Sequence, residues 1–101
     1  GYSYLVANKD KIKASSINGV QPSLEGIQDY SYPIARPLFF YVKKAHIGVI
    51  PGIQEYMKEF TSKKSMGSRG YLAEIGLVPL AADKYKVTRT AAVDLNTIKI
   101  K

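Results

Sequence analysis

The sequence predicts an α/β fold, a mixed sheet flanked by helices, from three observations. The run Leu38–Val42 has no polar break, and both of its alternating faces are apolar, as expected of a strand that is covered on two sides. Pro33 and Pro37 precede the run and cannot donate to a β-ladder, so they mark the entry to the strand. A helical stripe follows over Ile53–Phe60. A short buried helix is the alternative for the apolar run, but the prolines and aromatic residues favour a strand.

Shorter local signals come before this run. Asn18 and Gly19 predict a turn, because both residues tolerate positive φ. Ser23 follows Pro22 and is a suitable N-cap for a short helix that ends by Asp29. The remaining expectations here are the end of a helix over residues 2–8 and a strand over residues 11–16.

The clearest helical signal in the chain follows Pro51-Gly52. Apolar side chains stand there at positions i, i+3, i+4 and i+7, so they share one face of a helix. This face is expected to pack against the sheet. Its residues are Ile53, Tyr56, Met57 and Phe60.

Two further helices are expected. One spans Ser65–Ile75, with Gly76 as its C′ residue. Within it, Gly67 and Gly70 either weaken the helix by roughly 1 kcal/mol each or allow close packing. The last helix runs from Asp83 to about residue 94, and residues 97–101 form a tail.

Composition limits the possible functions. The chain has 101 residues, a formal net charge of +7 and no cysteine. Thiolate catalysis, disulfides and zinc–thiolate sites are therefore excluded. No apolar run approaches the roughly 20 residues of a membrane span. The basic residues are scattered in runs of at most two, which favours a solvated basic surface over a nucleic-acid footprint. The chain begins at Gly1 without an initiator methionine, and we interpret it as a piece of a longer protein.

Few residues suggest chemistry. Arg36 lies between the two prolines and could hold a phosphate or carboxylate with its planar fork, or simply be an exposed charge. His46 is the only histidine and has no second metal ligand at helical spacing, so we interpret it as a loop residue. The sequence has no Walker loop, no nucleophile elbow and no paired carboxylates. We therefore expect no enzyme, no cofactor and no metal site.

The order of short motifs along the chain says more about function than these patterns do. Over about residues 1–82 the chain resembles the C-terminal portion of the phosphate-binding proteins of bacterial phosphate ABC transporters. The blocks that carry the resemblance are GYSY at 1–4, INGV at 17–20 with Pro22-Ser23, YPIARPL at 32–38 with FYV at 40–42, and GYL at 70–72 with GLVPL at 76–80. Residues 83–101 match no family pattern.

The resemblance implies a type II periplasmic binding protein, whose two α/β lobes close on the anion. Residues 1–31 would end the second lobe, 32–44 would form a crossing hinge strand, and 45–101 would be the C-terminal part of the first lobe. The family's phosphate ligands lie upstream of Gly1, so no ligand residue is expected in this fragment, and Arg36 is not the arginine of that pocket. The candidate residue within the chain remains Arg36.

The implied function is that of a fragment of the solute-binding component of a phosphate ABC importer. In the intact protein the partners would be inorganic phosphate and the transporter permease, in the periplasm or on the outer face of a membrane. The alternative is a small basic nucleic-acid-binding or adaptor domain, suggested by the charge and the eight tyrosines. We expect no nucleic acid to bind at physiological salt.

Three consequences are expected from these interpretations. If the apolar run is covered on both faces, Phe40→Ala costs about 3–5 kcal/mol through the cavity it leaves. The fragment should self-associate, as a homodimer, through the run or through the helical stripe. The chain alone should not bind phosphate at micromolar concentration.

Overall fold

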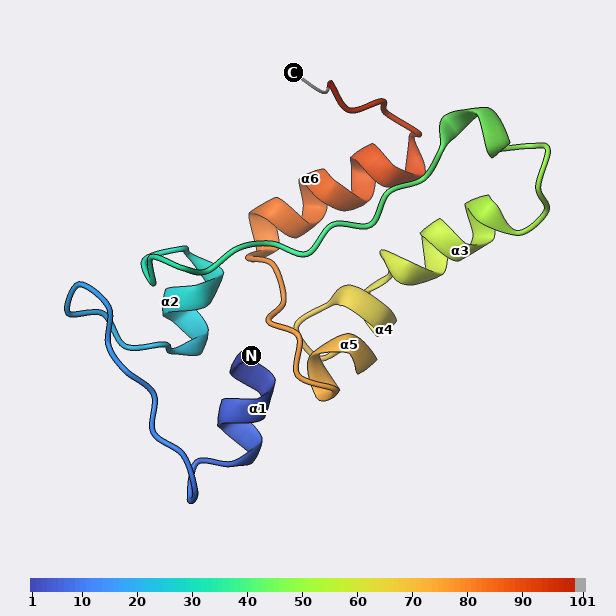
Figure 1. Cartoon of the computed structure of the whole chain (residues 1–101). Helices are drawn as coiled ribbons and strands as arrows, with labels where there is room; N and C mark the ends of the chain where they lie inside the picture. Colours follow the sequence, from blue (N-terminus) through green and yellow to red (C-terminus); the bar gives the residue numbers. More distant parts are fainter. Residues whose placement is uncertain (100–101) are drawn as a thin grey trace.

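The computed structural model describes residues 1–99, and the regular elements in that range are helices (Figure 1). Two isolated bridges, Ile17–Val20 and Ile47–Ile50, are the sole β pairings among these residues. The predicted mixed sheet is therefore wrong. The helices are α1 (Tyr2–Ala7), α2 (Leu24–Gln28), the 3₁₀ turn η1 (Lys44–His46), α3 (Ile53–Phe60), α4 (Lys63–Met66), α5 (Tyr71–Glu74) and α6 (Ala82–Val93).

The predicted central strand is an extended segment without a partner. Within residues 1–99, the N–H and C=O groups of residues 36–42 make no backbone hydrogen bond. Leu38 is 83% exposed, Phe39 69% and Tyr41 67%, so the prediction of a strand covered on both faces is also wrong. The reason is that a ladder needs a second strand. The strand predicted over residues 11–16 does not form, and no other part of the described chain supplies one.

Sequence signals for turns, caps and helices predicted the structure better than the signals for strands did. Asn18 and Gly19 both have positive φ, and the turn is closed by two hydrogen bonds between Ile17 and Val20 of 2.9 and 3.0 Å. Ser23 is the N-cap of α2, where its Oγ accepts a hydrogen bond from the Gly26 N–H at 3.0 Å. Helices α1, α2, α3 and α6 all lie where the sequence predicts a helix. Short-range hydrogen bonding fixes the turn and the cap, so these two features need no tertiary partner.

The predicted helix Ser65–Ile75 is divided into α4 and α5. At Gly70 a Cβ would collide with the backbone carbonyl of Ser65, and at Gly67 with that of Lys63. The glycines therefore permit a close turn between two short helices rather than weakening one long helix. Gly76 ends α5 as predicted, with φ +103° and the pair of backbone hydrogen bonds that defines a Schellman motif.

The buried core is small and lies where α3 meets α6 and α4. Met57 and Tyr85 are the buried large apolar residues, each 9% exposed. The Tyr85 hydroxyl donates to the Thr61 carbonyl at 2.7 Å, which joins α6 to the end of α3. Phe40 attaches the extended segment to α3, since its ring lies 4.8 Å from that of Phe60.

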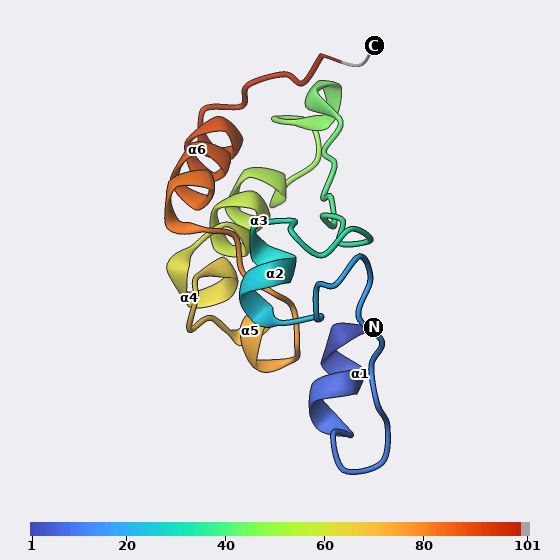
Figure 2. The same cartoon turned by 90° about the vertical axis from the view of Figure 1, so that its left-hand side faces the viewer.

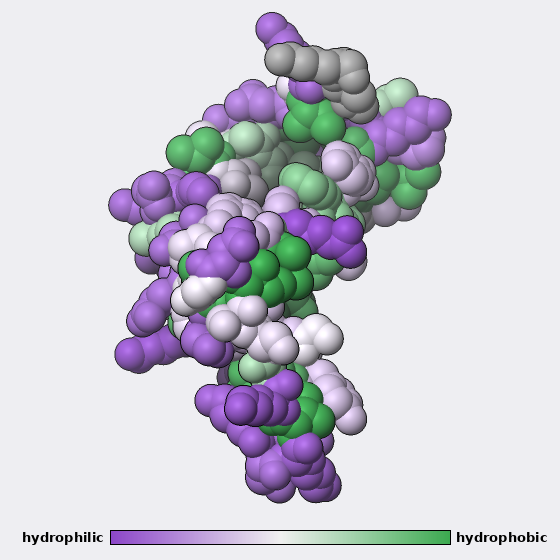
Figure 3. Space-filling model, turned by 60° about the vertical axis from the view of Figure 1, so that its left-hand side comes forward, coloured by the Kyte–Doolittle hydropathy of each residue, from purple (hydrophilic) through white to green (hydrophobic). Residues whose placement is uncertain are grey.

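The molecule is elongated. Its radius of gyration is 16.1 Å and its principal extents are 48 × 30 × 21 Å, whereas a compact chain of this length has a radius of about 13 Å. Figure 2 shows α1 and the loop after it projecting at one end of the molecule, away from α3 and α6. Apolar surface is open to solvent among hydrophilic residues (Figure 3). The described elements thus leave much apolar surface uncovered.

Candidate functional site

Arg36 is the candidate site residue that the sequence offers. Its side chain is exposed, and it lines neither of the two pockets described below. The neighbouring Pro37 and Ala35 offer no polar side chain that could share an anion with it. A single guanidinium in open solvent is a poor phosphate site, because the ion's lost water contacts must be replaced by several converging donors.

Two helix starts, at Ser23 and at Gly52, are further places where backbone N–H groups could meet an anion. The Ser23 hydroxyl already occupies the first turn of α2, where it accepts from the Gly26 N–H. Gly52 begins α3 with a left-handed φ of +90° and no side-chain cap. These two helix starts border no common pocket. Neither of these two pockets therefore brings the two helix starts together.

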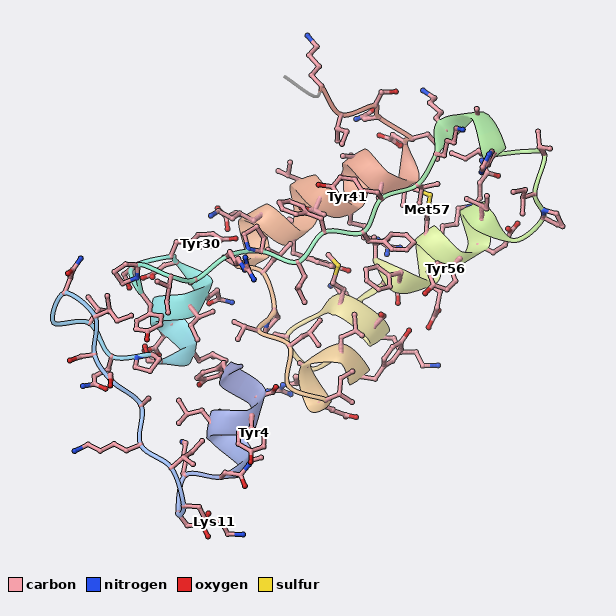
Figure 4. The ribbon with its side chains drawn as sticks, viewed as in Figure 1. Tyr4, Lys11, Tyr30, Tyr41, Tyr56 and Met57 are labelled. Atoms are coloured by element: carbon pink, nitrogen blue, oxygen red, sulfur yellow. The ribbon has the colours of Figure 1, made fainter. Side chains whose placement is uncertain are left out.

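The first pocket is an apolar groove of about 400 Å³ between the extended segment and the start of α3. Residues 40–43 form one wall, and residues 51–53 with Tyr56 form the other. Figure 4 shows Tyr41 on the extended segment and Tyr56 on α3. The Phe40 ring lies 5.5 Å from the Tyr56 ring in a tilted arrangement, so an aromatic contact joins the two walls. The groove offers apolar contact and carries one cation at its rim, Lys43.

The second pocket is basic and was not predicted. It has a volume of about 450 Å³ and lies between α4 and α6. Three of its lining residues are cationic: Lys63, Lys86 and Arg89. Arg89 is half-buried and donates from Nη1 to the carbonyl of Lys58 at 3.4 Å and to Thr61 Oγ1 at 3.5 Å. The sequence contains one signal for this pocket: Lys86 and Arg89 stand at i and i+3 on the predicted last helix and therefore share a face.

Asp29 is a carboxylate whose surroundings shift its pKa. The Ser31 N–H, which donates to Asp29 Oδ1 at 2.8 Å, and then the Ser31 hydroxyl lower the pKa of Asp29 below its ordinary 3.8. This carboxylate is fully exposed and belongs to a turn. The lone His46 is exposed at the end of the 3₁₀ turn η1, and no group of three or more potential metal ligands occurs among residues 1–99. No helix in the same range has the length and apolar character needed to cross a membrane.

Comparison with known proteins identifies the family. The PBP superfamily domain matches residues 1–64. The phosphate-binding protein PstS of Staphylococcus aureus strain USA300 is 36% identical over 80 residues, which cover 72% of this chain and 24% of that protein. The corresponding protein of strain bovine RF122 / ET3-1 is 34% identical over 80 residues, which again cover 72% of this chain and 24% of that protein. No solved structure matches significantly. The chain therefore spans about a quarter of the length of the curated relatives it matches.

Proposed function

The chain belongs to the PBP superfamily, and we propose that it is a segment of the solute-binding component of a phosphate ABC importer. The similarity to proteins named for phosphate binding carries this proposal. In the intact protein the ligand is inorganic phosphate and the partner is the transporter permease. The place of action is the periplasm or the outer face of a membrane, and the chain is not an enzyme.

Within that function, this segment supplies structure rather than ligands. The exposed Arg36 and the two separated helix starts give no convergent set of donors. We retain the division of the chain at residues 32–44 as part of the proposal: 1–31 belong to the end of the second lobe and 45–101 to the C-terminal part of the first. The extended segment then connects the two lobes, and we place this chain in the C-terminal portion of the full protein.

A chimera tests the function directly. The matching segment of Staphylococcus aureus PstS is replaced by this chain, and phosphate binding is measured by calorimetry. We expect the chimera to bind phosphate within about tenfold of the parent, a difference of roughly 1.4 kcal/mol. A matched chimera with Arg36→Ala should bind equally well. A folded chimera without phosphate affinity would contradict the proposal.

The basic pocket supports a second candidate, a small nucleic-acid-binding or adaptor domain. Lys63, Lys86 and Arg89 share this pocket, although the other bases are spread along the chain. Retention on DNA and RNA is measured at low and at physiological salt. Phosphate-backbone binding weakens by roughly 10³-fold between 50 and 200 mM salt when many contacts are made. We expect no retention at physiological salt, and tight retention that is lost in Lys86→Glu would favour this candidate.

A further inference from the structure

The corner that follows α2 contacts a distant part of the chain through two side chains. Gln28 at the end of α2 is half-buried, and its Nε2 donates a hydrogen bond of 2.9 Å to the carbonyl of Pro79. Tyr30 lies two residues later, and the Lys84 Nζ stands 4.8 Å from the centroid of its ring. Figure 4 shows Tyr30 next to the first turn of α6, which carries Lys84. We call these two contacts the latch.

The backbone at this corner is strained. Tyr30 has a φ of +63°, which is a costly conformation for an aromatic residue. A strained backbone of this kind persists where neighbouring contacts hold it, and such positions cluster at functional sites. The Tyr32 N–H, which donates to the Gly26 carbonyl at 2.9 Å, closes the corner from within, and the latch holds it from outside. The corner therefore presents Gln28 and Tyr30 in a fixed orientation.

The latch joins two parts of the chain that the proposed function assigns to different lobes. One side of the latch lies within residues 1–31 and the other within residues 45–101. The crossing segment 32–44 begins two residues after Tyr30. The latch is thus a second, non-covalent connection that lies beside the covalent one.

A third contact between the same two parts supports this arrangement. Gly76, three residues before Pro79, lies so close to α1 that a Cβ at Gly76 would collide with the side chain of Ser3. The segment that leads into α6 therefore follows the surface of the N-terminal part of the chain, from α1 to the corner after α2.

We propose, resting on the proposed function, that the latch stabilises the closed arrangement of the intact protein, in which the two lobes enclose phosphate. The lobes approach each other when they close on the anion, so a contact between them adds to the stability of the closed state. The apparent affinity of a ligand rises with the fraction of protein that is in the binding-competent state. The latch thus tightens phosphate binding without contacting the ion.

The two contacts are strong enough to shift this equilibrium measurably. Loss of a part-buried hydrogen bond, or of a cation–π pair, each changes an equilibrium by roughly three- to tenfold. Loss of both should therefore change it by about tenfold or more. The effect should appear mainly in the rate of phosphate release, because the closed state is what retains the ion.

The chimera of Staphylococcus aureus PstS that carries this chain serves for the test, with phosphate affinity measured by calorimetry and phosphate release by stopped flow. Gln28→Met keeps the size of the side chain but has no donor, and Tyr30→Ser removes the ring. Together they should weaken phosphate binding by about tenfold or more. Tyr30→Phe keeps the ring that faces the ammonium group, so it should bind phosphate like the parent chimera.

A double-mutant cycle separates the latch from a general loss of stability. Tyr30→Ser and Lys84→Ala remove the same contact, so the double variant should bind phosphate no more weakly than the weaker of the two single variants. Lys64→Ala is the matched control, because Lys64 is an exposed cation on α4, away from the latch. It should leave the affinity unchanged, both alone and on the background of Tyr30→Ser.

The outcomes distinguish failure of the latch from failure of the proposed function. If the parent chimera binds phosphate and the latch variants bind it equally well, the latch is overturned and the proposed function stands. Tighter binding in Tyr30→Ser would also overturn the proposal, because the contact would then belong to the open arrangement. A folded parent chimera without phosphate affinity would overturn the proposed function and the latch together.

Discussion

Phe40 is the residue that ties the extended segment to the helices, and its burial determines how much it stabilises. Its ring contacts Phe60 and Tyr56 on α3, yet the side chain is 46% exposed. A cost of 3–5 kcal/mol for Phe40→Ala requires a fully enclosed ring, so that expectation from the sequence is replaced. A half-buried phenylalanine ring that makes two ring contacts is expected to stabilise the folded state by about 1–2 kcal/mol.

Denaturant unfolding of Phe40→Ala at low protein concentration should therefore show a loss of about 1–2 kcal/mol. Phe39→Ala is the matched control, because Phe39 is 69% exposed and contacts no helix ring, and it should cost less than about 0.5 kcal/mol. Equal losses for the two variants would show that the ring contacts with α3 are not made.

Ser65 presents the opposite case, a polar group buried without a partner. The residue is fully buried, and its Oγ makes no hydrogen bond. Leaving a hydroxyl unpaired costs about 1–3 kcal/mol of desolvation. Ser65→Ala should consequently raise the free energy of unfolding by about 1 kcal/mol. A loss of stability of that size would mean that the hydroxyl has a partner in solution.

At the scale of elements, the sequence predicted what local chemistry decides. The Ser23 cap, the Asn18-Gly19 turn and the Gly76 helix end were found because each depends on a few neighbouring residues. The predicted sheet was wrong. The apolar run at 38–42 favours a strand, but whether a partner strand exists depends on residues elsewhere in the chain. The basic pocket was missed for the same reason: Lys63 and Arg89 meet through the packing of separate helices.

The close approach of α4 and α5 depends on Gly70. A Cβ there would meet the Ser65 carbonyl, which is backbone and cannot rotate away. Gly70→Ala should lower the free energy of unfolding by about 1–3 kcal/mol through overpacking. Ser68→Ala lies in the same loop and is exposed, so it should change stability by less than about 0.5 kcal/mol. If Gly70→Ala were neutral and raised the helix content, the single long helix predicted from sequence would be correct.

The buried hydroxyl of Tyr85 makes the shortest hydrogen bond between α6 and the end of α3. Tyr85→Phe removes the 2.7 Å hydrogen bond to the Thr61 carbonyl while keeping the ring. We expect a loss of about 1 kcal/mol in thermal or denaturant unfolding. Tyr41→Phe is a matched control, since the Tyr41 side chain is 67% exposed, and it should be neutral. If Tyr85→Phe left the free energy of unfolding unchanged, the Thr61 carbonyl would have to be hydrogen-bonded to water instead.

At the scale of the whole molecule, the open shape and the short core agree with the chain's share of its relatives, about a quarter of their length. Met57 and Tyr85 are the buried large apolar residues among residues 1–99, and a core of this size is modest for a chain of 101 residues. The family was recognisable from ordered motif blocks in the sequence. The expectation that this chain supplies no phosphate ligand stays a prediction, and the basic pocket lined by Lys63, Lys86 and Arg89 was not foreseen.

The central claim is that this chain supplies structure, and not ligands, to a phosphate-binding protein. Calorimetric titration of the 101-residue chain with inorganic phosphate at moderate salt tests it most directly. The account predicts no saturable heat at micromolar phosphate, and the same result for Arg36→Ala, because one exposed guanidinium contributes about 1 kcal/mol or less. A saturable micromolar isotherm that Arg36→Ala abolishes would contradict the claim and place the phosphate site within this chain.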